Sequence, residues 1–490
     1  MRRFSTGYLS LFMLLVLFAG RSFAATYYVD FASGNDASAG TSKTAPWKHA
    51  PGMQGCTGTC AAATVKPGDS LIFKGGVTWD HTCWAWVIPF SGTSANPIYV
   101  GVDQTWYAGS AWSQPVFDGQ TYAATGATDG SMIRNQTSSY ITYDNFEMKN
   151  LYITSPGGPA FVHADGAAGV SVKNSYLHGW TVPSSITKDD AHGGVYFING
   201  GGTVSHTTIS DVEQEAVRNS GVAIFGADMV DHVTVHDVAT ACLGCVTVHD
   251  STFYDISYPD HDFDLSYHTN GIYEIESGSV YNNLIYNFNA NAGAIYPNAC
   301  SGGSGPSQDW TQYVYNNVIW TGSGLTSGTP IIDVSPEVAQ GSGSCGTVYI
   351  FHNTIQSSGN VVAIRSAPWP TGQGQWIIKN LTVQNNQIIN ADGSNQTCFT
   401  GQSCDAASLV NDHNYFQSNS TASANGYTMN TGPSSAPTSM KGVDLSGLQI
   451  PTLNVDRLAV ARAPAWNAGA YAFGTSNVPA APNGLTAAVQ

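Results

Sequence analysis

Short apolar segments recur through the middle of the chain, and each is interrupted by one polar residue at a fixed place. The pattern is an apolar residue, any residue, then Asn, His or Asp, two further residues and another apolar residue. The segments are rich in Val, Ile, Tyr and Thr and are separated by clusters of Gly, Ser and Asn, which predicts short β-strands. Helical periodicity over about 11 residues is absent. The polar residues of the pattern are Asn150, Asn174, His206, His232, Asp250, Asn282, Asn316, His352 and Asn385.

The spacing of these polar residues predicts a repeat architecture. Successive members lie 24 to 36 residues apart, except that His232 and Asp250 are separated by 18 residues, which is short for a complete repeat. Repeats of this length form stacked supersecondary units, and neighbouring strands of a stack lie about 4.8 Å apart. A polar residue at one recurrent position of such a stack bonds its counterparts above and below. We therefore interpret His206, His232 and His352 as structural ladder residues.

Further motifs lie at the two ends of the chain. The opening carries Tyr27-Tyr28-Val29-Asp30, Gly34-Asn35-Asp36, Trp47 and Pro67-Gly68-Asp69, and the closing segment is 465–471. Together with the repeat, these segments resemble secreted bacterial proteins of the right-handed parallel β-helix, or pectin-lyase-like, superfamily. The resemblance covers roughly residues 27–473. It implies an all-β, single-stranded right-handed parallel β-helix with terminal caps and activity on polysaccharides, but a fold alone does not fix the reaction.

On this interpretation the chain divides into five segments. They are a signal peptide (1–24), an N-terminal cap with the first coils (25–130), the β-helix repeats (131–420), a C-terminal cap (421–476) and a tail that resembles the start of a fibronectin type III module (477–490).

The N-terminus predicts export. Arg2 and Arg3 precede an apolar run over 9–19, and Ser22-Phe23-Ala24 has the small residues of a signal-peptidase site. The run is too short to span a membrane, which takes about 20 apolar residues. We therefore expect a bacterial protein that is secreted or held at the cell surface, with no membrane partner.

Nine cysteines agree with an oxidising compartment. Cys83 is left over after pairing the others by proximity along the chain, although spacing does not fix connectivity. The alternative is a zinc site formed by Cys56, Cys60, Cys242 and Cys245. The proposed pairs are Cys56 with Cys60, Cys242 with Cys245, Cys398 with Cys404, and Cys300 with Cys345.

The charge of the chain limits the classes of ligand that it can bind. Lys and Arg total 17 against 33 Asp and Glu, a formal net charge of -16, which excludes a nucleic-acid partner because phosphate binding needs a basic face. Residues 219–364 contain 13 acidic residues and no Lys or Arg. An acidic surface repels a polyanion, so a neutral glycan fits better than a polyuronate. Bound Ca²⁺ would reverse that preference.

A second strand column predicts a row of outward-facing side chains. If Val195, Ile272, Ile295, Ile332 and Ile364 face the core, the residues that follow them face outward. Aromatic rings at about 4.8 Å intervals could bind sugar rings, or they could only stiffen the sheet; both interpretations remain open. The predicted substrate-binding residues are Tyr196, Tyr273, Tyr296, Asp333 and Arg365.

Two polar clusters precede strands of this column, at 188–194 and 258–271. Glycoside cleavage needs one carboxyl group to protonate the leaving oxygen and another to activate water or to attack. We predict Asp190, Asp262 and Asp264 in these roles, with His192 and His268 orienting them. The alternatives are a solvated loop or a calcium site. The calcium ligands would be Asp260, Asp262 and Asp264, although Leu265 replaces the Gly of an EF-hand loop.

Three functions are compatible with these observations. The first is a secreted, monomeric glycoside hydrolase that needs no cofactor. The second is a calcium-dependent polysaccharide lyase or epimerase acting on uronates, with Arg218 or Lys188 as its cationic partner. The third is a non-catalytic, glycan-binding surface or adhesion protein.

Overall fold

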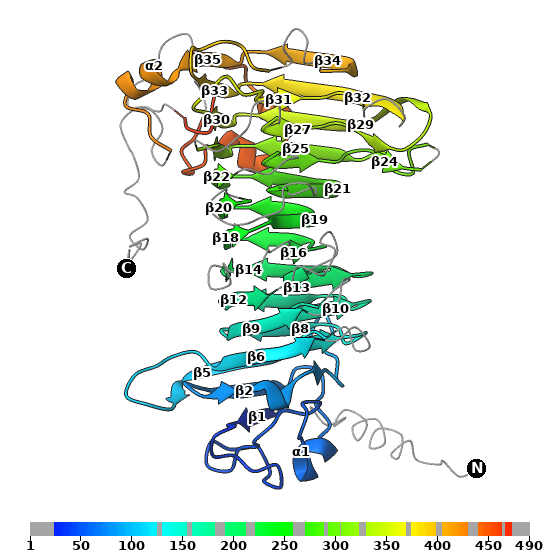
Figure 1. Ribbon diagram of the computed structural model, residues 1–490, viewed down its shortest axis with the longest axis vertical. Coiled ribbons are helices and arrows are strands. Elements are labelled where there is room, and N and C mark those ends of the chain that lie inside the picture. Colours follow the sequence, from blue (N-terminus) through cyan, green and yellow to red (C-terminus); the bar gives the residue numbers. More distant parts are fainter. Residues whose placement is uncertain are drawn as a thin grey trace, which may run out of the picture.

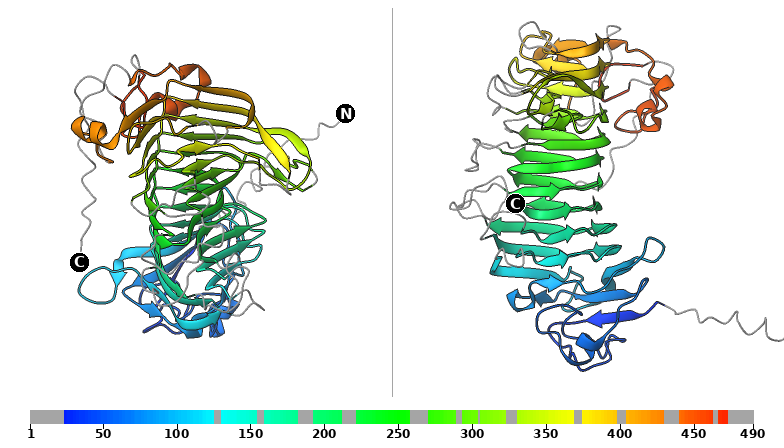
Figure 2. Two further views of the ribbon diagram at one scale, coloured as in Figure 1. Left: turned by 45° about the horizontal axis from the view of Figure 1, so that its top comes forward. Right: turned by 90° about the vertical axis from the view of Figure 1, so that its right-hand side faces the viewer.

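The strands of this protein stack along one long axis, from β1 at one end to β34 and β35 at the other (Figure 1). The computed structural model describes residues 24–124, 130–153, 159–181, 192–211, 221–257, 270–288, 293–303, 305–322, 330–368, 374–397, 404–429, 440–462 and 466–472. Every pairing between its named strands is parallel, and the two further views in Figure 2 show the same stack. The prediction of an all-β parallel β-helix is confirmed.

Two long sheets form the walls of the stack, and one two-stranded sheet lies beside them. The 21-stranded sheet contains β1 (Thr26–Val29), β2 (Ser70–Gly75), β4 (Trp86–Val87), β5 (Ile98–Tyr107), β7 (Ile133–Asn135), β8 (Ile141–Asp144), β10 (Val162–Asp165), β11 (Val170–Lys173), β13 (His192–Ile198), β14 (Gly202–Ser205), β16 (Val222–Phe225), β17 (Met229–Asp231), β19 (Thr240–His249), β21 (Ile272–Tyr281), β23 (Ile295–Pro297), β25 (Thr311–Tyr315), β27 (Ile332–Asp333), β29 (Ser342–Phe351), β31 (Ile364–Arg365), β32 (Gln375–Gln384) and β34 (Ala406–Asp412).

The second wall of the stack, the small sheet and the helices complete the fold. The 12-stranded sheet contains β3 (Thr78–Trp79), β6 (Val116–Ala124), β9 (Glu147–Ile153), β12 (Tyr176–Thr181), β15 (Thr208–Ser210), β18 (Thr234–Val238), β20 (Thr252–Ile256), β22 (Leu284–Phe288), β26 (Val318–Trp320), β30 (Thr354–Gln356), β33 (Gln387–Asn390) and β35 (Tyr415–Ser418). The small sheet pairs β24 (Ser301–Gly302) with β28 (Glu337–Val338). The helices are α1 (Gly58–Ala62), α2 (Asn419–Ala424) and the 3-10 turns η1 (His81–Cys83), η6 (Ser446–Leu448) and η7 (Pro451–Asn454).

The core consists of inward side chains that occupy matching positions in successive coils. Alternate residues of a strand point to opposite faces, so the apolar positions of each strand stack on those of the next. In the first coils the core is aromatic, and Phe73 contacts Trp79, Trp86, Phe117 and Phe146. Further along it is aliphatic, and one fully buried column consists of Val172, Val204, Val230, Val248, Val280, Val314, Ile350 and Val383.

The predicted Asn/His/Asp column marks a bend in each coil, with one correction. Asn150 lies inside β9, and the bend of its coil is at Asn145, whose backbone N–H donates to Lys173 O as the other bend residues donate to the next coil. Asp250 does belong to the column, despite its short spacing. The bend residues have left-handed φ angles of 49–59°, which Asn and Asp tolerate best. They are Asn174, His206, His232, Asp250, Asn282, Asn316, His352 and Asn385.

A continuous amide ladder lies one residue after the bend and points inward. The side chain of Asn283 donates to Asn317 (3.0 Å), Asn317 to Asn353 (2.9 Å), Asn353 to Asn386 (3.0 Å) and Asn386 to Asn414 (3.0 Å). Each acceptor oxygen also receives the backbone N–H of the preceding coil. The sequence pattern located the ladder at the bend residue itself, where the contacts alternate between ring stacking and isolated hydrogen bonds.

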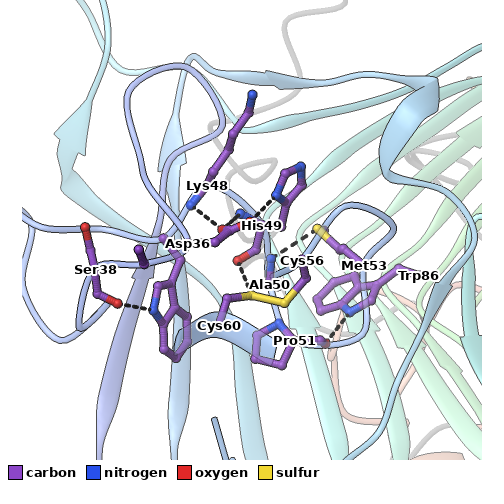
Figure 3. Close-up of a disulfide and its surroundings, with 12 residues drawn as sticks. Asp36, Ser38, Lys48, His49, Ala50, Pro51, Met53, Cys56, Cys60 and Trp86 are labelled. Atoms are coloured by element: carbon purple, nitrogen blue, oxygen red, sulfur yellow. Dashed lines mark hydrogen bonds and ion pairs between the residues drawn. A yellow bond between two sulfur atoms is a disulfide. The ribbon is translucent and has the colours of Figure 1, made fainter. Parts of the chain in front are cut away.

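Three of the predicted cysteine pairs form disulfides, namely Cys56–Cys60, Cys242–Cys245 and Cys300–Cys345. The four cysteines of the alternative zinc site are therefore joined as two disulfides. Cys83 is buried and free, as predicted, and Cys398 lies outside the described residues. Figure 3 shows the first disulfide beside the buried Asp36–His49 pair, in which carboxylate and imidazole are 2.7 Å apart.

The C-terminal segment folds back onto the side of the stack. Leu453 and Trp466 pack with Tyr315 and Phe351, which belong to β25 and β29. Arg462 is 1% exposed and donates to Asn316 Oδ1 at 2.7 Å, so this segment is tied to the bend column. None of the helices within the described ranges has the length and apolar character that a membrane crossing needs.

Asp30 makes a contact in the first coil that we expect to be sensitive to acid. Burial alone would raise the pKa of Asp30, but hydrogen bonds from Lys74 (2.8 Å) and Ser33 outweigh it and lower that pKa below the ordinary value. A carboxyl group with a lowered folded-state pKa stabilises the fold above its unfolded pKa, and that contribution is lost as pH falls below about 4. Asp30→Asn is expected to cost about 1–3 kcal/mol at pH 7, with the difference from wild type shrinking below pH 4 in denaturant titrations.

The control for this prediction is the exposed pair Lys43–Asp103, in which Lys43 lowers the pKa of Asp103 to about 2. Solvent screens that pair, so Asp103→Asn should destabilise the protein less than Asp30→Asn. Equal effects of the two substitutions would contradict the role given to burial.

Candidate functional site

The predicted outward residues lie in one row across the 21-stranded sheet. Their predecessors Val195, Ile272, Ile295, Ile332 and Ile364 are at most 1% exposed and face the core, as expected. Strand register aligns the residues that follow them, and the row continues further toward the N-terminus than the sequence indicated. We call this set the outer row: Arg134, His163, Tyr196, Phe225, Leu243, Tyr273, Tyr296, Asp333 and Arg365.

Four members of the outer row were missed from the sequence. Arg134, His163, Phe225 and Leu243 each follow a buried residue in a short strand, which is the same signal that identified Tyr273. The difference is that three of the five members identified from the sequence are tyrosines, whereas none of the four missed residues is a tyrosine. A search for one apolar residue followed by any residue at the coil spacing, aliphatic residues included, would have found them.

Much of the outer row is covered. Tyr196 is 8% exposed, Tyr296 is 4% exposed and Asp333 is 4% exposed. The rings of Tyr273 and Tyr296 stack on each other, with centroids 5.1 Å apart and planes 16° apart. Tyr296 also donates its hydroxyl to Ser335 O at 2.6 Å. These contacts favour the stiffening interpretation for Tyr296, because its ring face and its hydroxyl both have partners within the protein.

Tyr273 forms a polar cluster with Asn298 and Glu337. Its hydroxyl donates to Glu337 Oε2, and the Asn298 amide donates to the Tyr273 hydroxyl at 2.6 Å and to the same carboxylate oxygen at 3.0 Å. Burial, followed by the negative charge of Glu337, raises the pKa of Tyr273 well above its usual range. The phenol therefore stays protonated and serves as a donor, while Glu337 is a carboxylate held by two donors.

The small sheet fixes Glu337 in this position. Glu337 begins β28, which pairs with β24 in the register Ser301–Glu337, and Cys300 directly precedes β24. The disulfide from Cys300 to Cys345 ties this lateral sheet to β29. Glu337 is 64 residues from Tyr273 and lies outside the periodic columns, so no sequence pattern pointed to it.

Asp333 and Arg365 form an ion pair in the outer row. An Arg365 Nη donates to Asp333 Oδ2 at 2.6 Å, while the backbone and hydroxyl of Ser335 donate to the other carboxylate oxygen. Each charge thus meets its opposite within the protein. The pair is predicted from the sequence to bind substrate, and this role stays a prediction.

The two polar clusters are joined to strands of the same sheet. His192 begins β13 and Asn270 lies just before β21, and both occupy one register row through Val222 and Thr240. Three strand spacings separate the two positions, or about 14 Å. Between them, the connection from β18 to β19 is the single residue Ala239.

Most of the predicted catalytic residues lie outside the described residues. Of His192 only the backbone is described, at the start of β13. The others lie outside the described residues, and so do the ligands of the alternative calcium site; their roles stay predictions. These residues are Asp190, Asp260, Asp262, Asp264 and His268.

The chain has only remote likenesses among solved structures. No protein-family model and no curated protein matches the chain. A solved rhamnogalacturonan lyase is 14% identical, with a TM-score of 0.44 over 80% of this chain and 87% of its own. A GH136 lacto-N-biosidase from Eubacterium ramulus is 13% identical, with a TM-score of 0.42 over 73% and 67%. A pectate lyase is 14% identical, with a TM-score of 0.37 over 93% and 91%. By its own strand pairing, the chain has the parallel β-helix fold that its resemblance to the pectin-lyase-like superfamily implied.

Proposed function

We propose that this protein is a secreted enzyme that cleaves a polysaccharide lying along the outer row. The observation that carries the proposal is the register of that row, which brings hydroxyl, imidazole, carboxylate and guanidinium groups from seven strands into one line. Sugar units could contact only those members of the row that are partly exposed, because the others are covered. The partly exposed members are Arg134, Phe225, Leu243, Tyr273 and Arg365. Both polar clusters, at 188–194 and 258–271, join strands of this row, β13 and β21.

The reaction we favour is glycoside hydrolysis. Asp262 or Asp264 would act as acid or base with Asp190, and His192 and His268 would support them. The two carboxyl groups of such a pair stand about 5–10 Å apart. The strand positions next to the clusters are about 14 Å apart, and a carboxyl separation of more than about 10 Å would exclude this pairing.

The acidic character of the sheet supports a neutral substrate. Residues 219–364, which hold most of the outer row, have 13 acidic residues and no Lys or Arg. The guanidinium of Arg365 is already neutralised by Asp333. A polyuronate would meet uncompensated carboxylates over this stretch.

The second candidate is a calcium-dependent lyase or epimerase. It is favoured by Arg134, a cation in the outer row at its N-terminal end. With Ca²⁺ at Asp260, Asp262 and Asp264, the charge argument would reverse. Arg218 or Lys188 would then stabilise the charge that develops on the uronate.

Export is part of the proposal. Three disulfides support folding in an oxidising compartment, in agreement with the predicted signal peptide. We infer that the enzyme works outside the cytoplasm as a monomer, with a polysaccharide and neither nucleic acid nor a membrane as its partner.

Incubation of the purified protein with a panel of neutral and acidic glycans tests the proposal. We expect new reducing ends on a neutral glycan, without ultraviolet-absorbing unsaturated ends and without a change on chelation by EDTA. Unsaturated ends on a polyuronate that require Ca²⁺ would favour the lyase. Binding without cleavage of any member of the panel would contradict both enzymes and favour the adhesion protein.

A further inference from the structure

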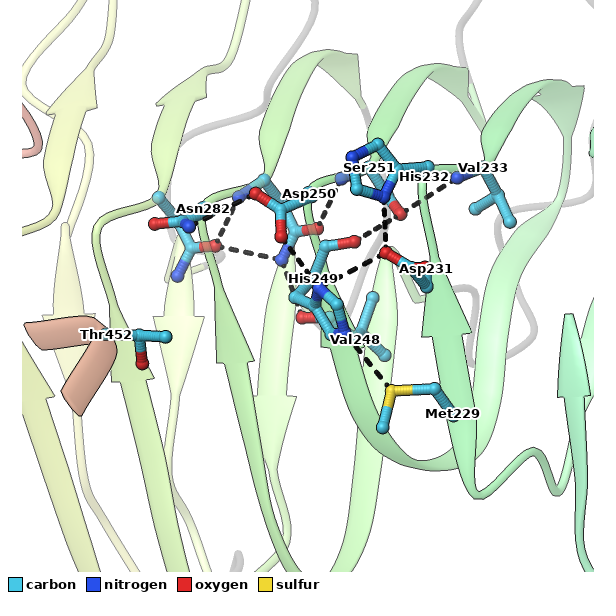
Figure 4. Close-up of polar contacts among 12 residues, drawn as sticks. Met229, Asp231, His232, Val233, Val248, His249, Asp250, Ser251, Asn282 and Thr452 are labelled. Atoms are coloured by element: carbon cyan, nitrogen blue, oxygen red, sulfur yellow. Dashed lines mark hydrogen bonds and ion pairs between the residues drawn. The ribbon is translucent and has the colours of Figure 1, made fainter. Parts of the chain in front are cut away.

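A second polar cluster lies at a corner of the stack, away from the outer row. We call it the corner cluster, and it consists of Asp231, His232, His249 and Asp250 (Figure 4). Asp231 and His249 are the last residues of β17 and β19, and His232 and Asp250 are the bend residues that follow them. Asp231 and His249 are register partners in adjacent coils. Leu243 of the outer row lies six residues before His249 on the same strand.

The donor atoms of the corner cluster converge. One ligand atom each of Asp231, His249 and Asp250 lies within 4.8 Å of the others. The Nδ1 atom of His249 is 2.7 Å from Asp250 Oδ2 and 3.4 Å from Asp231 Oδ1. His232 Nδ1 contacts that same oxygen of Asp231. Two imidazole nitrogens thus meet two carboxylates in one small volume.

Contacts at both ring nitrogens orient the side chain of His249. Its Nδ1 atom lies 2.7 Å from Asp250 Oδ2, and its Nε2 atom lies 3.2 Å from the sulfur of Met229. The ring edge that carries Nδ1 therefore faces the two carboxylates, and imidazole nitrogen and carboxylate oxygen are both ligand atoms of Zn²⁺.

The surroundings hold the ligand atoms in place. The ring of His249 stacks on Tyr281, with centroids 4.8 Å apart and planes 7° apart. Asn282 donates to Asp250 Oδ1 at 3.1 Å, which directs the other carboxylate oxygen toward His249. Such outer contacts orient metal ligands in known sites. The side chains of His249 and Asp250 are 17% and 33% exposed, so an ion can enter from solvent.

We propose that the corner cluster binds a divalent transition-metal ion, with Zn²⁺ as the reference ion, through Asp231, His249 and Asp250. Zn²⁺ takes imidazole nitrogen and carboxylate oxygen in four-coordinate sites, and His232 or water completes the set. Ca²⁺ is disfavoured because it binds oxygen ligands. The ion would join two adjacent coils at the shortest repeat of the solenoid, between His232 and Asp250.

Calorimetric titration of the metal-free full-length protein with ZnCl₂ tests this site. We expect one equivalent to bind, at least tenfold weaker binding in His249→Gln and Asp231→Asn, and a Zn²⁺-dependent rise of the denaturation midpoint in the wild type only. Co²⁺ bound at the site should give a visible absorption band that both variants lose.

The matched control is the corner of the last coil. Asp412 and His413 form an equivalent Asp-His pair, with Asp412 Oδ1 and His413 Nδ1 2.8 Å apart, and His413 has a bend φ of 54°. Asp412→Asn should leave Zn²⁺ binding unchanged. Absence of binding to the wild type, equal loss in Asp412→Asn, or binding that survives in His249→Gln would each overturn the proposal. Glycan cleavage is not a readout here, so failure of the proposed function would leave this test intact.

Discussion

Replacing Asp262 with asparagine should reduce glycan cleavage about 10³-fold, because the amide neither donates a proton to the leaving oxygen nor activates water. Asp264→Asn is the companion variant, and at least one of the two should show the full loss. The unfolding midpoint should change little, since the proposal gives Asp262 and Asp264 a catalytic and not a structural role. The measurements are initial rates on the cleaved glycan and denaturant titration of each variant.

Asp260→Asn distinguishes catalysis from calcium binding. Under the hydrolase proposal Asp260 has no role in the chemistry, so its variant keeps its activity. If all three variants lose activity and excess Ca²⁺ restores it, the three carboxylates are ligands instead. Full activity in both Asp262→Asn and Asp264→Asn would remove the cluster from the mechanism altogether.

Asn353→Leu should cost about 3–5 kcal/mol of unfolding free energy, because it interrupts the buried amide ladder in its middle. The Asn353 side chain accepts the backbone and side-chain N–H groups of Asn317 and donates to Val314 O and Asn386 Oδ1. Leucine has the same branching at Cγ but no polar atoms, so these buried groups lose their partners. Urea titration monitored by circular dichroism measures the change.

Two controls accompany the ladder variant. Asn360 is exposed and donates to Asp392 Oδ2 at 2.9 Å, so Asn360→Leu should change stability by less than about 0.5 kcal/mol. Asn414 is the last amide of the ladder and is only partly buried, whereas Asn353 is 0% exposed. Asn414→Leu should therefore cost less than Asn353→Leu. Equal costs at Asn353 and Asn360 would show that the ladder contributes little.

Periodicity accounts for most of what the sequence predicted correctly. The inward column with Ile272 and Ile295 and the outward neighbours Tyr273 and Tyr296 follow from a two-residue strand period repeated at the coil spacing. The two errors in the predicted polar column were shifts of five residues and of one residue along the chain. Asn150 was chosen in place of Asn145, and the amide ladder was located at the bend in place of the residue after it.

What sequence reasoning missed comes from contacts that do not repeat. Glu337 reaches Tyr273 because a disulfide and the two-stranded sheet of β24 and β28 hold it beside the main sheet. Burial of Tyr196 was also unforeseen, since a residue that points away from the core can still be covered. Of the corner cluster, the sequence pattern identified His232 and Asp250 as members of the polar column. It did not identify Asp231 or His249, because their contact depends on the short coil between them.

The free edge of β34 has a consequence for how long such a protein can become. Among the described residues β34 pairs only with β32, and Leu409 and Val410 are 43% and 39% exposed at this end. A duplicated coil, such as the 33 residues from His352 to Gln384, would find unpaired backbone groups and apolar surface to pack against. Evolution can therefore lengthen this molecule by gene duplication at its last turn without redesigning the turns already present.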